Sequence, residues 1–433
     1  MAKQEKSEPV LYVYSDRSIL VDEDGVKCQY EEGQTTPLAK TRLATIKSSL
    51  EEGFLEKLII ECQNPEVKIK EIQPEQIAII KSLVDSVTSE VGRAIVGLTI
   101  LQLTVKSIIP EQSIRLHKGS TGGEFSWKEG IPMRVLDKNY ITPILRKYNL
   151  LKLNADGFMM TRSLAENYPY SKLYKAAIRG AKGEWMEITD SVEKGTLDSY
   201  NALKHLLIFL NNNSIAFKEL TNEASLALIK YIRAKPKYKN CFHVVINFIE
   251  SSTYSARMFE VALHTLFQVL EEEKCLSGFL KPLSQMRSAN KKHGNIGDIE
   301  VTLTQGNMDI IESWDAKYGK TYLRDELEEL NDKLKSHPQT KLAGFVTDQR
   351  PNLKPEIRKR IEELELIHET AIPVLEFEEW VVMQIDKYEL DRDKVGIAWL
   401  KAIEESICQK RREIAPIDEP TGEWVQTFIE CLK

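Results

Sequence analysis

Asp298, Asp315 and Lys317 have the residue types and the spacing of a metal-dependent hydrolytic site. Asp298 opens one stretch of alternating polar and apolar residues, and the triplet Asp315-Ala-Lys317 ends a second such stretch. Carboxylate oxygens are ligands that Mg²⁺ prefers, and a nearby ammonium group can stabilise charge that develops on a phosphate. Brought to one place, the three residues would suit metal-assisted hydrolysis of a phosphodiester.

A β-hairpin would bring them together. Gly306-Asn307 suits a two-residue turn with glycine at its first central position, and that turn sets Asp298 directly opposite Asp315. Side chains two positions apart in a strand share a face, so Lys317 is expected on the face of the two acids. The fit is imperfect, because Ile311 would also fall on the acidic face. A different turn would shift the register by one residue and separate the acids.

Two acids on opposite positions of a hairpin are unfavourable unless something lies between them. Directly opposed Cβ atoms are about 4.5–5.5 Å apart, so the carboxylates repel each other. A divalent cation between the carboxylates removes this repulsion. The alternative is that both acids are solvated charges on an exposed face, since Asp-x-Lys triplets recur by chance. The register, the alternation and the order of the surrounding elements favour a site.

The elements around the hairpin predict an α/β domain. The strands of the hairpin are expected over 298–304 and 308–318. Periodic apolar residues predict a long amphipathic helix before it, over 254–273. The elements expected after it are helices over 322–334, 355–369 and 394–412, with strands over 342–347 and 373–377. Strands and helices that alternate in this way are typical of a sheet flanked by helices.

The first half of the chain has a different pattern, which is mainly helical with some mixed structure. We expect a strand within 10–20, a helical stretch over 74–109 and a helix near 198–210. The change in pattern predicts a boundary near residue 245, which divides the chain into regions 1–245 and 246–433. With 433 residues, the chain is long enough for two or three domains.

The composition is that of an ordinary globular protein, with 42% hydrophobic and 29% charged residues. The net charge is −6, so a nucleic-acid partner would require a local excess of positive charge. No two cysteines have CxxC spacing, and the first residues lack the apolar run of a signal peptide. The apolar stretch that begins at Val91 is short and charged for a membrane span, and it is interpreted as a buried helix.

The order helix, hairpin, helix, strand, with these acids and this lysine, resembles the PD-(D/E)xK nuclease superfamily over about residues 250–380. Asp298 stands at the first acidic position, and Asp315-Ala-Lys317 stands at the second motif in its aspartate form. Gly297 stands where the family commonly has proline. The string 288–300 and the upstream runs within 125–170 are similar to type II restriction endonucleases, in particular to a SacI-like group.

The resemblance implies a sequence-specific endonuclease that cleaves double-stranded DNA with Mg²⁺ and leaves 5′-phosphate ends. It implies a C-terminal nuclease core, with DNA recognition and dimerisation assigned to the N-terminal region. Asp298 and Asp315 would hold the metal, and Lys317 would act in catalysis with them. Glu260 matches an acid that many members keep near the metal, although a solvated helix residue three positions after Arg257 would have the same pattern. Glu300 shares the acidic face, as a further ligand, as a residue that supports the ligands, or as a surface carboxylate.

Positive charge precedes the first acid, where a phosphate backbone could lie. The residues expected to contact DNA are Asn290, Lys291, Lys292 and His293 in this loop, with Arg115, Ser120 and Arg162 as candidates for reading bases. An arginine can bond guanine through two donors in the major groove, but arginines more often pair with surface acids. A second basic cluster, between Arg350 and Arg360, either faces DNA or is a solvated helix face.

Two other functions stay open at this point. The chain could be a related nuclease that acts on structured or modified nucleic acid, or a DNA-binding protein with a decayed site. The intact acids and lysine count against decay, and the absence of a GxxxxGK[ST] motif counts against a translocating restriction enzyme. A palindromic target requires two sites related by a two-fold axis, so a homodimer is expected. The resemblance also implies a prokaryotic cytoplasm and a separately encoded DNA methyltransferase as a partner.

Overall fold

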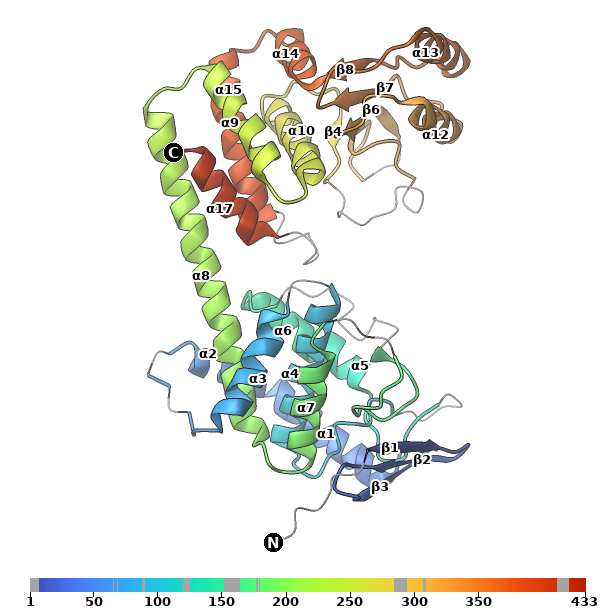
Figure 1. Cartoon of the computed structure of the whole chain (residues 1–433), viewed down its shortest axis with the longest axis vertical. Helices are drawn as coiled ribbons and strands as arrows, with labels where there is room; N and C mark the ends of the chain where they lie inside the picture. Colours follow the sequence, from blue (N-terminus) through green and yellow to red (C-terminus); the bar gives the residue numbers. More distant parts are fainter. Residues whose placement is uncertain are drawn as a thin grey trace. The chain divides into compact units, whose positions relative to one another are not determined.

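The computed structural model describes residues 8–64, 66–67, 69–87, 90–119, 125–151, 164–176, 178, 180–283, 294–306, 309–410 and 420–433. The chain divides into two compact units (Figure 1), and in the described residues the division falls between Phe217 and Lys218. This division falls within the long helix α8 (Ser199–Arg233) rather than near residue 245. The reason is that α9 (Tyr238–Ser251) packs against α10 (Ser255–Glu272) and α15 (Arg392–Glu405), so it belongs to the second unit.

The first unit combines a small antiparallel sheet with a group of helices. The sheet has the order β1 (Val10–Val13), β2 (Arg17–Val21), β3 (Lys27–Glu31), so the single strand expected within 10–20 is instead a hairpin. The helices are α1 (Pro37–Glu51), α2 (Phe54–Cys62), α3 (Pro74–Asp85), α4 (Glu90–Ile108), α5 (Met133–Leu136), η1 (Asp137–Ile141), α6 (Thr142–Lys147) and α7 (Lys182–Glu193). As expected, α4 is buried along most of its length.

The second unit contains a five-stranded mixed sheet. Its strands lie in chain order, which is β4 (Phe279–Leu280), β5 (Ile299–Thr302), β6 (Ile310–Lys317), β7 (Leu342–Thr347) and β8 (Val374–Glu376). The pairs β4–β5 and β5–β6 are antiparallel, whereas β6–β7 and β7–β8 are parallel. The mixed α/β class expected for this part of the chain is confirmed.

Helices cover both faces of this sheet (Figure 1). On one face, α10 packs against β5 and β6, and Trp380 of α14 (Phe377–Lys387) contacts the rings of Trp314 and Phe267. On the other face, α12 (Arg324–Leu334) and α13 (Pro355–His368) share an apolar cluster with Phe345 of β7. The unit is completed by η4 (Ser406–Lys410) and α17 (Thr421–Cys431).

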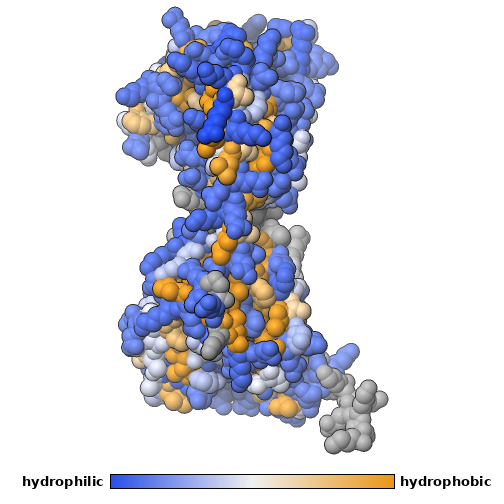
Figure 2. Space-filling view, turned by 90° about the vertical axis from the view of Figure 1, so that its left-hand side faces the viewer, coloured by the Kyte–Doolittle hydropathy of each residue, from blue (hydrophilic) through white to orange (hydrophobic). Residues whose placement is uncertain are grey.

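The surface is largely hydrophilic, as the face drawn in Figure 2 shows. Some large apolar side chains are nevertheless exposed, among them Leu226 on α8 and Leu366 on α13. Scattered exposed apolar residues are normal on a globular surface. Within the described ranges, no helix has both the length and the apolar character that a membrane crossing requires.

Candidate functional site

The hairpin places the two aspartates beside each other. Ile299 pairs with Trp314 and Glu300 pairs with Ser313, and Asp298 N donates a hydrogen bond to Trp314 O at 3.0 Å. This is the register expected from the sequence, and it sets Asp298 next to Asp315 at the edge of the sheet. The acidic face is the face that α12 and α13 cover, so the acids lie over a layer of helices rather than on an open sheet surface.

The turn of the hairpin is not the two-residue turn expected from the sequence. The strands end at Thr302 and Ile310, which pair with each other, and Leu303 N donates to Asp309 O at 3.0 Å. The connection is therefore longer, and Asn307 lies outside the described residues. The pairing shifts at Thr302, which leaves Ile311 as the extra residue of a β-bulge.

The bulge explains why the alternation of the sequence was imperfect. Strict alternation would place Ile310 on the apolar face beside Trp314, but it joins the cluster of α12 and α13 on the acidic face. An extra residue in a strand of period two reverses the faces of everything on its other side. Leu303, which alternation would place beside Val301 in the core, lies beyond the end of β5 and is exposed.

Asp298 is in an environment that disfavours its charged form. Burial raises its pKa well above the usual range, and the neighbouring carboxylates of Asp315 and Glu260 raise it further. One oxygen, Oδ2, accepts a hydrogen bond of 3.0 Å from Ala316 N. The effect of Glu260 on this pKa shows that the acid of α10 lies close to the pair from β5 and β6.

Lys317 supplies positive charge to the same cluster. Its Nζ lies 2.7 Å from Asp315 Oδ1, in side chains that are 22% and 13% exposed. Burial acts to lower the pKa of Lys317, but the carboxylates of Asp315, Asp298 and Glu326 outweigh it and the pKa is raised. The four residues expected to be catalytic, Asp298, Asp315, Lys317 and Glu260, are thus brought together.

Glu260 also has a structural partner. It forms an ion pair with Arg257, one helical turn earlier in α10, whose guanidinium is buried. A buried cation beside the cluster offsets part of the negative charge of the three acids. The pair with Arg257 at i+3 is the one that the alternative for Glu260 named, and the Glu260 side chain is 25% exposed, so its role at the metal stays a prediction.

Glu326 was not anticipated from the sequence. It lies in α12, is largely buried, and pairs through Oε1 with Lys320. Among the described residues, its other oxygen Oε2 has no hydrogen-bond partner. A signal was present in the sequence, because Glu326 interrupts the apolar stripe of Leu323, Leu327 and Leu330, and a charged residue inside such a stripe requires a partner.

Of the residues expected to contact DNA, the structure describes Arg115 alone. Arg115 belongs to the first unit and is 5% exposed. Its guanidinium lies 2.6 Å from Asp190 and donates to Tyr170 O at 2.6 Å, so it is engaged within the fold rather than presented to a base. The other six, Ser120, Arg162, Asn290, Lys291, Lys292 and His293, lie outside the described residues.

The donor set of the cluster fits a hard divalent cation. Asp298 and Asp315 offer carboxylate oxygens side by side, and burial with the neighbouring carboxylates of Asp315 and Glu260 raises the pKa of Asp298, an effect that a bound cation would offset. Among the residues that the structure describes, no three or more histidine, cysteine, aspartate or glutamate side chains are arranged as a ready metal site. The protein part of a site here would therefore be the aspartate pair, with Glu260 nearby.

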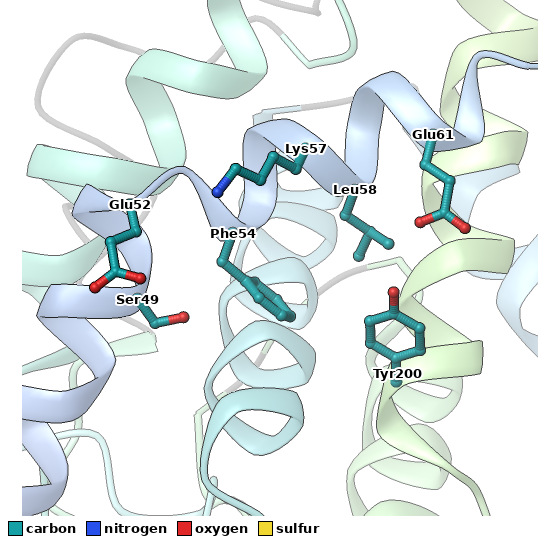
Figure 3. A pocket seen from close by; sticks show the side chains of 7 residues that line it. All are labelled: Ser49, Glu52, Phe54, Lys57, Leu58, Glu61 and Tyr200. Atoms are coloured by element: carbon teal, nitrogen blue, oxygen red, sulfur yellow. The ribbon is translucent and has the colours of Figure 1, made fainter.

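The first unit has a separate surface hollow of about 240 Å³, shown in Figure 3. Glu52 and Glu61 lie at opposite ends of its lining, with Phe54 between them and Tyr200 toward the end of Glu61 (Figure 3). Lys204 pairs with Glu61 at 2.6 Å. Because its carboxylates are held apart, this hollow does not repeat the chemistry of the aspartate pair.

Comparisons with known proteins add no assignment: no protein-family model matches this chain, and no curated protein matches it. A functional proposal therefore rests on the geometry of the acidic cluster and on the chemistry of its residues.

Proposed function

We propose that this protein is a Mg²⁺-dependent, sequence-specific endonuclease that cleaves double-stranded DNA in the manner of type II restriction enzymes. The observation that carries the proposal is the meeting of Asp298, Asp315 and Lys317 at one end of the β5–β6 pair, with Glu260 of α10 beside them. Together with the order of helix, hairpin, helix and strand, this arrangement supports a PD-(D/E)xK nuclease core.

Each side chain has a distinct role in this proposal. Asp298 and Asp315 would hold the cation, and a bound cation would favour the charged form of Asp298. When bound there, Mg²⁺ supplies Lewis acidity and a water molecule of lowered pKa. Lys317 is kept charged by its acidic neighbours, so its ammonium group stabilises the negative charge that develops on the phosphate. Hydrolysis that leaves 5′-phosphate ends follows from the family resemblance.

A basic segment lies at the same end of the sheet. Lys317 pairs with Thr347, the last residue of β7, and the segment 348–360 follows directly. Its loop is tied to the one after β6, because Asn352 N donates to Thr321 O at 2.9 Å and Gly319 N donates to Asp348 Oδ1 at 2.7 Å. Exposed cations on this segment are therefore held near Lys317, where DNA phosphates would pass.

Plasmid cleavage tests the proposal directly. The protein is incubated with mixed-sequence plasmids in Mg²⁺ and in EDTA, and discrete fragments are expected only with the metal. Asp298→Ala and Asp315→Ala are each expected to lower the cleavage rate at least about 100-fold while DNA binding in Ca²⁺ is kept. Asp386→Ala is the matched control, since Asp386 is an exposed acid in an ion pair with Arg392.

The other outcomes identify the alternatives. A smear, or cleavage confined to branched or modified substrates, would indicate a nuclease of different specificity. Binding of DNA without any cleavage in Mg²⁺ or Mn²⁺ would indicate a decayed site. Full activity in either aspartate variant would refute the assignment of the ligands.

A further inference from the structure

Glu300 is the most deeply buried carboxylate near the candidate site, with 3% of the residue exposed. It lies on β5 two residues after Asp298. Its Oε1 accepts hydrogen bonds from Ile296 N at 2.5 Å and from Gly297 N at 3.3 Å. The carboxylate thus bonds to the backbone of the two residues that directly precede Asp298.

Lys281 compensates the charge of Glu300. Its Nζ lies 2.6 Å from Glu300 Oε2 and 3.4 Å from Asn295 Oδ1. Its backbone is fixed as well, since its N–H donates to Glu300 O at 2.9 Å and its carbonyl lies 2.9 Å from His264 Nε2. A buried carboxylate without such a partner would be strongly unfavourable, so the pair forms one structural unit.

Residues 296 and 297, which directly precede Asp298, are held by the hydrogen bonds that their N–H groups donate to Glu300. A Cβ atom on Gly297 would lie 2.7 Å from both Ser313 Oγ and Trp314 O, so only glycine fits against β6. Glycine is also the residue with the greatest backbone freedom. The segment is also held at Ile296, whose carbonyl accepts a hydrogen bond of 2.9 Å from Lys333 Nζ of α12 and whose side chain is buried in the cluster of α12 and α13.

A proline at position 297 would stiffen the chain through its ring but could not donate a backbone hydrogen bond. Here the same position is glycine, and its N–H donates to Glu300. Glycine does not restrict the backbone as proline does. Here the Glu300 carboxylate restricts it instead, because it accepts hydrogen bonds from two successive N–H groups.

We propose that Glu300 is a positioning residue for Asp298, with Lys281 as its counter-ion. It fixes residues 296 and 297, and through them the side chain of Asp298 beside Asp315. The inference rests on the proposed nuclease function in that it assigns Asp298 to the cation, and it extends that function to residues that touch neither the cation nor DNA.

The main test is the variant Glu300→Gln, which keeps the size of the side chain but removes its charge. We expect the turnover rate of plasmid cleavage to fall about 10- to 100-fold, because partners of metal ligands typically have effects of this size. The Mg²⁺ concentration for half-maximal cleavage should rise, while the KM for DNA should stay unchanged. Backbone amides of Ile296 and Gly297 should exchange with solvent faster in metal-free protein.

Two further variants separate positioning from simple destabilisation. Lys281→Met leaves the Glu300 carboxylate buried without its cation, so it should lower the unfolding midpoint. Adding Glu300→Gln to Lys281→Met should restore the midpoint but not the Mg²⁺ requirement. Glu312→Gln is the matched control, because Glu312 is a half-buried carboxylate of the same hairpin that accepts a hydrogen bond of 2.8 Å from Trp314 Nε1. Cleavage and exchange in this variant should match the wild type.

The exchange and metal-binding readouts hold even if the proposed function fails. If the wild-type protein does not cleave DNA, binding of Mn²⁺ is measured by its electron paramagnetic resonance signal. Weaker Mn²⁺ binding with faster exchange at 296 and 297 in Glu300→Gln would support the positioning role without nuclease activity. Unchanged exchange at these amides, or wild-type cleavage with a wild-type Mg²⁺ requirement, would overturn it.

Discussion

At the scale of single residues, Asp298 is a carboxylate whose surroundings oppose its ionisation. Its charged form is opposed by burial and by two other carboxylates, and the pKa is raised accordingly. A group whose pKa is higher in the folded protein than the ordinary 3.8 holds its proton more tightly when folded. The stability that it contributes is complete below that ordinary value and is lost as the pH rises through the raised pKa.

Asp298→Asn is therefore expected to stabilise the metal-free protein while it abolishes cleavage. The increase in the free energy of unfolding should be absent below about pH 3.8 and should grow with pH to about 0.5–2 kcal/mol, the usual range for a single stabilising substitution. Urea unfolding at a series of pH values in EDTA measures it. Asp386→Asn, on an exposed acid, should show no such growth, and an Asp298→Asn protein less stable than wild type at pH 8 would contradict the prediction.

The sequence was sufficient to find the acid pair and the lysine, since residue type, alternation and register act over short distances. It was not sufficient for Glu300 and Glu326. Whether a carboxylate is solvated or buried depends on which helix or loop covers it, and Lys281, Ile296 and Lys320 come from three different segments. Arg115 shows the same limit, because its partner Asp190 comes from a distant helix.

At the scale of elements, several boundaries were predicted within two residues. Examples are β7 (Leu342–Thr347), α10 and α13, whose first-turn proline marks its start. The helix α14 was missed because it begins directly after β8, with no turn residue between them. The helical pattern over 74–109 is broken into α3 and α4, and α8 continues far beyond the part near 198–210 that was expected.

The basic segment after β7 gives a prediction about elements. Arg350 and Lys354 are exposed at the end of the sheet that carries Lys317, and Lys354 lies over the ring of Tyr322. If each contacts one phosphate, the double variant Arg350→Gln/Lys354→Gln should reduce the slope of log K against log salt by about 2, from roughly 0.9 per phosphate. DNA binding is measured in Ca²⁺ over a range of KCl concentrations.

The control for this prediction is a second pair of exposed lysines on the same unit. Lys335 follows α12 and Lys341 precedes β7, at the opposite end of the sheet. Lys335→Gln/Lys341→Gln removes the same formal charge and should leave the slope unchanged. Equal slopes for the two double variants would show that the basic segment has no special place in DNA binding.

At the scale of the whole molecule, the division into two compact units was expected, but its position was not. The change in sequence pattern near 245 reflects the start of strand and helix alternation, whereas the structural division lies inside a continuous helix. Sequence patterns report local periodicity, and a helix that runs through a boundary has no change in periodicity there. The assignments of recognition and dimerisation to the first unit remain proposals.

Cleavage of both strands at a palindromic site gives the prediction for the assembly. We expect a homodimer, with about twice the 49.6 kDa mass of one chain by light scattering. In heterodimers that contain one wild-type and one Asp298→Ala chain, only one strand should be cut, so nicked circles should accumulate in place of linear plasmid. Linear product at the wild-type ratio, or a monomer on DNA, would contradict the two-site arrangement.

The bulge at Ile311 divides the hairpin into parts that tolerate change differently. On the side of the acids, odd and even positions decide which side chain meets Asp298, so deletion of one residue between Glu312 and Asp315 would put Ala316 in the place of Asp315. On the side of the loop, the bulge already interrupts the alternation. The segment 303–309 can therefore change in length without changing the face on which each residue of 312–317 lies. Homologues of this chain should therefore differ in the length of that loop, while the spacing from 312 to 317 stays constant.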